Sequence, residues 1–79
     1  MTPIQRRLLT AIVHYVRRHG YPPTLRELTV LAAVSSTSVA AHNLRRLQAR
    51  GYLTIGEKRA RTIVLTEHGR REAGIGIAP

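Results

Sequence analysis

The 79-residue chain contains no cysteine, no tryptophan and no phenylalanine. Without cysteine it can form neither a disulfide framework nor a zinc finger, and it has no thiol nucleophile. No apolar run approaches the roughly 20 residues of a membrane span, and the N-terminus, MTPIQRR, lacks the apolar stretch of a secretory signal peptide. We therefore expect a soluble, cytoplasmic protein that does not insert into a membrane.

Acidic residues are scarce as well. Four acidic residues stand against thirteen basic ones, which gives a formal net charge of +9 at pH 7. The acids are dispersed along the chain, and the histidines at positions 14, 19, 42 and 68 contain no i, i+4 pair suited to a metal ion. Glycine-rich phosphate loops and nucleophile elbows are also missing. We expect no enzyme, no metal or cofactor site and no small-molecule ligand.

The basic residues are mostly arginine, twelve of the thirteen. The planar guanidinium group fits phosphate and the edge of guanine. A charge of this size is an argument about partners rather than about fold. Nucleic acid is the leading candidate, and an acidic membrane surface or an acidic protein is the lesser alternative.

Three helices are indicated by capping residues and by the spacing of apolar side chains. A capping box at residues 2–5 opens the first helix, and Gly20 follows its basic last turn. A second box at residues 24–27 opens a short helix that runs to near Ala33, with Leu25, Leu28 and Leu31 facing inward. Either Ser35 or Ser36 can cap a third helix over about 37–50. The second and third helices form a helix-turn-helix pattern.

After Gly51 the apolar period changes from helical to alternating. Residues 52–55 and 62–65 read as two strands, joined by a loop at 56–61 that carries three positive charges. The chain is therefore predicted to be mainly α with a small β-hairpin, a winged helix-turn-helix of three helices and a two-stranded wing over residues 1–66. Residues 67–79 are predicted to form a short helical turn and a flexible C-terminal tail.

The helical angle predicts which face of the third helix is free. Advancing about 100° per residue puts the apolar side chains on one face, together with the polar Asn43, which we interpret as making a structural hydrogen bond. The opposite face carries Ser38, Ala41, His42 and Arg45. Small side chains at its N-terminal half would let the helix enter a groove, where Ser38 and His42 could reach base edges.

Several stretches resemble the N-terminal DNA-binding domain of the LexA repressor family. They are GYPPTLREL at 20–28, SSTSV at 35–39, LRRL at 44–47, RGYL at 50–53 and RTIVL at 61–65. The segment GYPPT-x-RE is the most specific of them, and the resemblance covers residues 2–66. It implies that the third helix enters the major groove of double-stranded DNA and that the wing touches the backbone.

The expected DNA-contacting residues combine this resemblance with the free face. The base contacts are Ser36, Ser38, Val39, Ala41, His42 and Arg45, and the backbone contacts are Arg26, Thr37, Arg46, Lys58, Arg59 and Arg61. We expect a transcriptional repressor, or the DNA-binding domain of one, that pairs as a homodimer on two half-sites. The chain can equally be a fragment of a longer repressor or a stand-alone regulator.

Two other functions remain open. The first is a DNA-binding protein of a phage or mobile element that acts in replication or recombination. The second is a winged helix used for contacts with protein or RNA, which would call for aromatic or large apolar side chains on the free face of the third helix. With three tyrosines as its only aromatic residues, the sequence offers little support for the second alternative.

Overall fold

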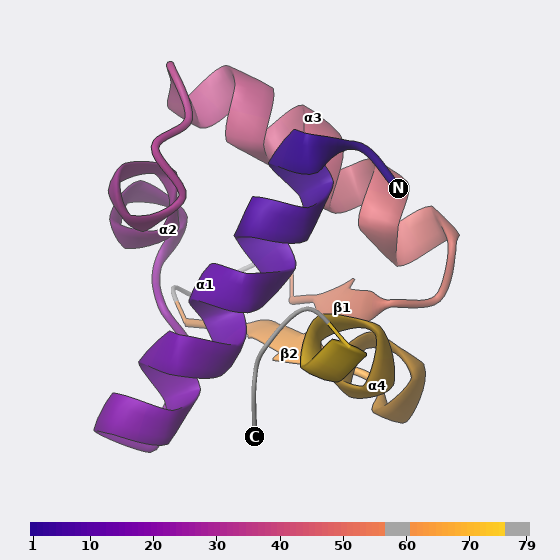
Figure 1. Ribbon diagram of the computed structural model, residues 1–79. Helices are drawn as coiled ribbons and strands as arrows, with labels where there is room; N and C mark the ends of the chain where they lie inside the picture. Colours follow the sequence, from indigo (N-terminus) through magenta and orange to yellow (C-terminus); the bar gives the residue numbers. More distant parts are fainter. Residues whose placement is uncertain (57–60, 76–79) are drawn as a thin grey trace.

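The computed structural model describes residues 1–56 and 61–75. Over these ranges the elements are α1 (Pro3–His19), α2 (Leu25–Leu31), α3 (Thr37–Ala49), β1 (Leu53–Ile55), β2 (Ile63–Leu65) and α4 (Glu67–Ile75). Figure 1 shows α1 crossing the middle of the molecule, with α2 and α3 at one end and the hairpin and α4 at the other. The predicted class, mainly helical with a small antiparallel hairpin, is confirmed.

Both predicted capping boxes are present. The hydroxyl of Thr2 accepts the amide of Gln5, whose side-chain oxygen accepts the amide of Thr2, each at 3.2 Å. Thr24 and Glu27 make the same reciprocal pair at 3.1 and 2.8 Å. Two of the unpaired amides at each helix start are thereby satisfied. Gly20, with a φ of 81°, ends α1 in the left-handed conformation that glycine adopts without strain.

The second helix differs from its prediction in length and in facing. It ends at Leu31 instead of near Ala33, and Leu31 is 54% exposed. Thr29 takes the inward position, because its hydroxyl donates to the carbonyl of Leu25 at 2.8 Å and so can be buried without an unpaired polar group. The expectation that Leu31 faces the core was therefore wrong. Ser36, rather than Ser35, caps α3.

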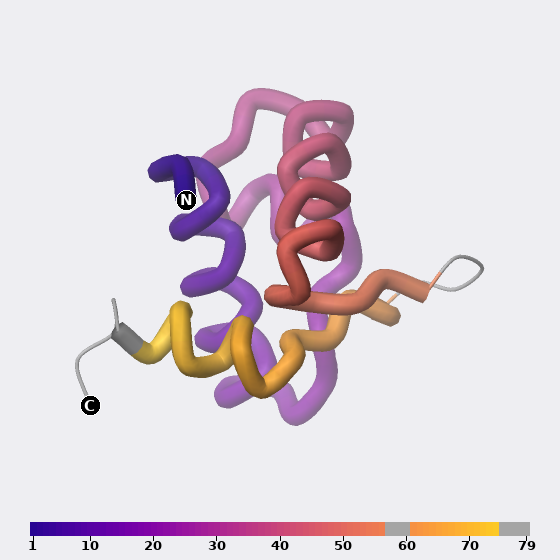
Figure 2. Tube along the Cα trace, turned by 90° about the vertical axis from the view of Figure 1, so that its right-hand side faces the viewer, coloured from indigo at the N-terminus to yellow at the C-terminus, as the bar shows by residue number. Residues whose placement is uncertain are grey.

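The wing hairpin has the predicted alternation. Leu53 pairs with Leu65 and Ile55 with Ile63 in antiparallel register, and the inward side chains of Leu53, Ile63 and Leu65 are buried. Figure 2 shows this hairpin extending away from the helices beyond the end of α3.

The C-terminal segment forms more helix than the single turn that the sequence indicates. α4 runs over Glu67–Ile75, with Ala73 fully buried. Gly69 is also buried, and a side chain there would collide with the backbone carbonyl of Tyr52. Arg6 of α1 donates to the carbonyl of Glu72 at 2.9 Å. Figures 1 and 2 show α4 lying beside both α1 and the hairpin.

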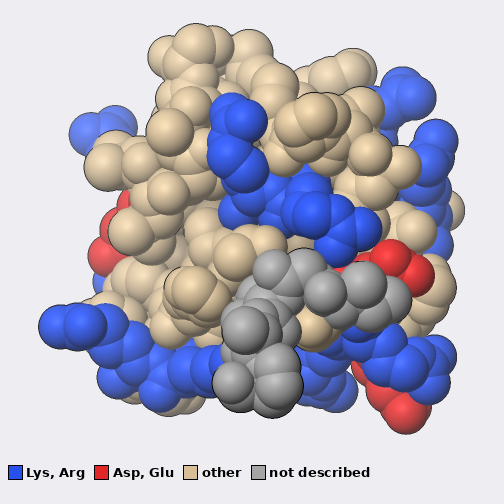
Figure 3. Space-filling model, viewed as in Figure 1, with Lys and Arg blue, Asp and Glu red and all other residues tan. Residues whose placement is uncertain are grey.

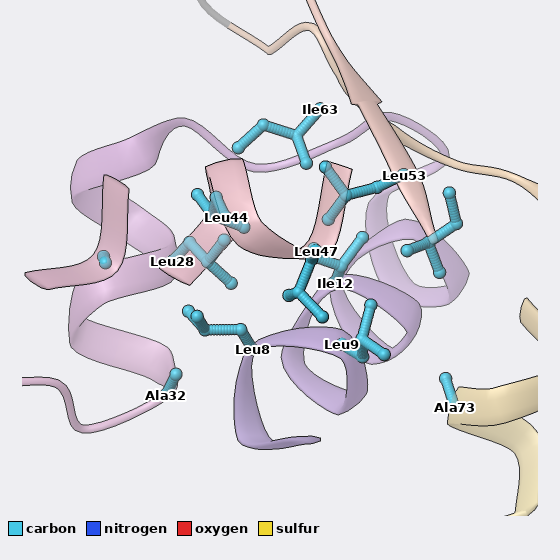
Figure 4. Close-up of a cluster of buried hydrophobic side chains, with 12 residues drawn as sticks. Leu8, Leu9, Ile12, Leu28, Ala32, Leu44, Leu47, Leu53, Ile63 and Ala73 are labelled. Atoms are coloured by element: carbon cyan, nitrogen blue, oxygen red, sulfur yellow. The ribbon is translucent and has the colours of Figure 1, made fainter. Parts of the chain in front are cut away.

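One apolar core joins all of these elements. Figure 4 shows that α1, α2, α3 and the hairpin all point side chains into it. The largest apolar side chains that are fully or almost fully buried in it are those of Leu8, Leu9, Ile12, Leu28, Leu44, Leu47 and Leu53. Because α3 contributes Leu44 and Leu47 to this core, the direction in which its outer face points is fixed by packing.

Candidate nucleic-acid interface

The burial pattern of α3 confirms which of its faces is free. Ala40, Leu44 and Leu47 are buried, and Val39 lies at the margin. The exposed residues of the helix are Thr37, Ser38, His42, Arg45, Arg46, Gln48 and Ala49, and Ala41 is half-buried. The outer face therefore carries small and polar side chains toward the N-terminal end of the helix and arginines one to two turns further along it.

Asn43 holds α3 against α1. Its side-chain oxygen accepts a hydrogen bond from the side-chain amide of Gln5 at 3.2 Å, and its own amide donates to the carbonyl of Val39 at 2.9 Å. Gln5 is only 4% exposed. The structural interpretation of Asn43 is confirmed, and the pair fixes the rotation of α3 about its own axis.

The N-terminal end of α3 is open to solvent. The hydroxyl of Ser36 accepts the amide of Val39 at 3.2 Å, and Ser36, Thr37 and Ser38 are all exposed. Amide groups at the start of a helix carry partial positive charge and suit a phosphate oxygen. This end of the helix therefore combines hydroxyl groups with a favourable potential for an anion.

A groove of about 750 Å³ runs between the start of α2, the outer face of α3 and the base of the wing. It brings together five of the predicted contact residues, Arg26, Thr37, Ala41, Arg45 and Arg61. In the part of the chain that the structure describes, the lining includes three arginines and no acidic residue. An anionic strand is the partner that such a lining favours.

The remaining predicted contacts fall into two groups. The first group lies at the N-terminal end or on the outer side of α3 but does not line this groove. It consists of Ser36, Ser38, Val39, His42 and Arg46. Lys58 and Arg59 lie at positions outside the described ranges.

Gln48 is a groove residue that the sequence prediction missed. It is exposed and lines the groove one turn after Arg45 and two turns after Ala41. Its spacing of seven residues from Ala41 was a usable signal, because positions i, i+4 and i+7 share a helix face.

Arg61 is held by the protein itself. Its guanidinium group contacts both carboxylate oxygens of Glu27, at 2.9 and 3.2 Å. The same group donates to the hydroxyl of Tyr15 at 2.9 Å and to the carbonyl of Pro22 at 3.3 Å. It also stacks over the ring of Tyr21, 4.7 Å from the centroid. These contacts tie the base of the wing to α1 and to the start of α2.

This cluster sets the charge of Glu27. The amide of Thr24, together with hydrogen bonds from Arg61 and Tyr15, lowers the pKa of the Glu27 carboxyl to about 2. Hydrogen bonds to Tyr15 and Glu27 raise the pKa of Arg61. Glu27 is therefore a carboxylate over the physiological range, and its charge is neutralised by Arg61.

Some of the other arginines also have structural partners. Arg7 donates to the carbonyl of Ala32 at 2.9 Å, and Arg6 lies 3.8 Å from the carboxylate of Glu72. Figure 3 shows basic side chains across the face that carries α1 and α4, so the positive charge is not confined to the side of the groove. The groove is distinguished by its shape and its helix, not by charge alone.

Two kinds of site are absent from the described ranges. No helix there is long and apolar enough to cross a membrane. Nor do three or more histidine, cysteine, aspartate or glutamate side chains gather there in a group that could hold a metal ion.

Comparison with known proteins identifies the family. Residues 1–62 match the model of the LexA DNA binding domain. The LexA repressor of Frankia casuarinae is 45% identical over 96% of this chain, and that of Acidothermus cellulolyticus is 40% identical over the whole chain. The alignment covers 30% of the length of each of these two relatives.

A solved structure agrees with this result. The transcriptional regulator Tm0710 from Thermotoga maritima superposes with a TM-score of 0.68 at 32% identity, over 92% of this chain and 49% of that one. The match to a family model over most of the chain, the similar curated repressors and the winged helix-turn-helix fold agree: this chain belongs to the LexA DNA-binding domain family.

Proposed function

We propose that this domain binds double-stranded DNA in a sequence-specific way and represses transcription by occupying a promoter. The observation that carries the proposal is the exposed outer face of α3 beside a groove lined by Arg26 and Arg45. An α-helix fits the major groove of B-DNA, where each base pair presents a distinct pattern of donors and acceptors. The names of the similar repressors support the regulatory role.

In this proposal the two sets of residues act differently. Ser38, Ala41 and His42 read base edges, with Ser36 and Val39 at the margin of that face. Arg26, Thr37 and Arg46 contact phosphates, as do the wing residues Lys58 and Arg59. Arg45 and Gln48 face the groove and can reach either a guanine or adenine edge or the backbone. Phosphate contacts supply most of the affinity and base contacts supply the sequence preference.

Pairing on DNA follows from the small size of the domain. A single module of this kind buries a limited area on DNA, so we infer that two copies bind two half-sites about 10 base pairs apart, or a multiple of that distance. The proposed location is the cytoplasm, together with the DNA. Residues 1–66 are proposed as the DNA-binding unit, and α4 braces the hairpin against α1.

The proposal is tested by selecting bound duplexes from a random DNA pool at roughly physiological salt. We expect a two-fold symmetric motif whose half-site spacing gives the geometry of the pair. Binding that follows ionic strength alone, with no enriched motif, would overturn sequence-specific recognition. A motif without symmetry would retain recognition and overturn the pairing.

A further inference from the structure

We propose that Glu27 and Arg61 are positioning residues for the wing: their ion pair fixes the orientation of the hairpin strands relative to the helix-turn-helix, and DNA binding depends on that orientation. The proposal rests on the proposed DNA-binding function. Under this proposal Glu27, an acidic residue beside the groove, promotes DNA binding. Arg61 acts through its contact with Glu27.

The pair connects two parts of the chain that are far apart in sequence. Arg61 lies two residues before β2, whereas Glu27 lies in the first turn of α2, 34 residues earlier. The guanidinium engages the carboxylate through both of its terminal nitrogens. A bidentate pair of this kind fixes direction as well as distance. The start of β2 is therefore oriented relative to the helix-turn-helix.

The surroundings of Arg61 reinforce this orientation. Tyr15 donates its hydroxyl hydrogen to Glu27 at 3.1 Å while accepting from Arg61 at 2.9 Å, so three side chains close a small network. The ring of Tyr21 covers the guanidinium plane. The backbone of Arg61 has a φ of 61°, a left-handed conformation that is uncommon outside glycine and persists when its surroundings fix it.

The same contacts argue against a direct phosphate contact by Arg61. A phosphate that took the guanidinium away would leave the carboxylate of Glu27 unneutralised next to a DNA strand, where like charges repel. It would also have to compete with a carboxylate, a phenol and an aromatic ring that are already in place. Arg61 therefore stays with Glu27 when DNA binds, and phosphates are left to the loop of the wing and to the helices.

This assignment reverses the prediction of simple electrostatics. Removing a glutamate raises the positive charge of a protein that already carries +9, and charge alone would then strengthen DNA binding. If Glu27 positions the wing, its removal weakens binding instead. The sign of the effect separates the two explanations.

Glu27→Gln is the appropriate variant, because a glutamine at this position can keep the helix cap. Gln5 occupies the same third position of the α1 capping box, and its side-chain oxygen accepts the amide of Thr2. Glu67→Gln is the matched control. Glu67 also pairs with an arginine, Arg71 at 3.4 Å, but on an exposed turn of α4, and the variant makes the same change in charge.

Affinity is measured for both variants on the selected duplex, at several salt concentrations and well below the lower melting temperature. We expect Glu67→Gln to bind as tightly as the unchanged protein or slightly more tightly. Glu27→Gln should bind about fivefold more weakly, because a hairpin that the ion pair no longer orients must be ordered on binding. Its log–log salt slope should be lower by about 1 to 2, because phosphate contacts are lost. Equal or tighter binding by Glu27→Gln than by Glu67→Gln overturns the proposal.

Arg61→Lys provides a second variant that keeps the charge. A phosphate contact tolerates lysine, whereas a bidentate and stacked site does not. We expect Arg61→Lys to weaken binding as much as Glu27→Gln does, and the double variant to be no weaker than either single one. Full retention of affinity by Arg61→Lys, or additive losses in the double variant, overturns the proposal.

A readout without DNA separates this proposal from the proposed function. Amide hydrogen exchange at residues 62–65 of the free protein should be faster in Glu27→Gln than in Glu67→Gln, while exchange in α3 stays unchanged. Unchanged exchange in the hairpin overturns the positioning role even if the protein binds an operator. Failure of the unchanged protein to select any motif overturns the proposed function and leaves the exchange result to decide the role of the pair in orienting the wing.

Discussion

The side-chain amide of Gln5 on α1 donates a hydrogen bond at 3.2 Å to the side-chain oxygen of Asn43 on α3, 38 residues later. Gln5 also closes the capping box of α1, so one residue serves both the start of the first helix and the placement of the third. The face that α3 offers to DNA thus depends on a polar contact on its inner side.

Replacing Asn43 with alanine should lower the free energy of unfolding by about 1–2 kcal/mol, because it leaves the nearly buried amide of Gln5 without its partner. Gln48→Ala is the control on the same helix, since Gln48 is exposed and should change stability by less than about 0.5 kcal/mol. Denaturant unfolding followed by circular dichroism measures both. Equal stability of the two variants would contradict the role given to the Gln5–Asn43 contact.

Gly69→Ala should destabilise the domain by about 3 kcal/mol, because the new methyl group collides with the backbone carbonyl of Tyr52, and a backbone group cannot easily move aside. Gly74 lies in the same helix with open space around the position of its missing side chain. Gly74→Ala should therefore be neutral or stabilising by about 0.5 kcal/mol. Thermal melts of the two variants compare them directly, and a Gly69→Ala protein as stable as Gly74→Ala would show that α4 does not pack closely on Tyr52.

Stability should depend on pH through Glu27. Its pKa is lowered from 4.5 to about 2 in the folded protein, so the folded state binds this proton less readily than the unfolded state. The stabilisation is then fully present above the ordinary pKa and is lost as the pH falls toward about 2. The difference in melting temperature between the unchanged protein and Glu27→Gln should be constant down to about pH 5 and shrink below it. A difference that stays constant to pH 2 would contradict the lowered pKa.

Arg26→Ala should weaken binding equally on all duplexes and reduce the salt slope by about 1, because a phosphate contact carries no sequence information. Arg17→Ala changes the charge equally on an exposed side chain of α1 that does not line the groove, and serves as the control. Fluorescence anisotropy over a salt series gives both slopes. The assignment of Arg26 fails if both variants show the same slope.

Local signals in the sequence were sufficient to predict much of the fold. The two capping boxes, the glycine that ends α1 and the 100° spacing along α3 each depend on residues within a few positions of one another. Such signals state where a helix begins and which face it buries. The free face of α3 and the structural hydrogen bond of Asn43 were predicted for this reason.

What the sequence did not indicate depends on distant contacts. Two glycines within Glu67–Ile75 argue against a helix by propensity, yet Gly69 is required there because only a residue without a side chain lets α4 approach Tyr52. Thr29, not Leu31, faces inward because its hydroxyl finds a carbonyl on its own helix. The ion pair of Glu27 with Arg61 spans 34 residues, and no spacing rule reaches so far.

Sequence reading by α3 is tested most directly by comparing the affinity for the selected duplex with that for a scrambled duplex of the same length at the same salt concentration. We predict that the difference in binding free energy between the two duplexes falls by about 1–3 kcal/mol per lost base contact in the Ser38→Ala, His42→Ala double variant, and the affinity ratio falls with it, while affinity for the scrambled duplex stays the same. An unchanged ratio would contradict the claim that the outer face of α3 reads the DNA sequence.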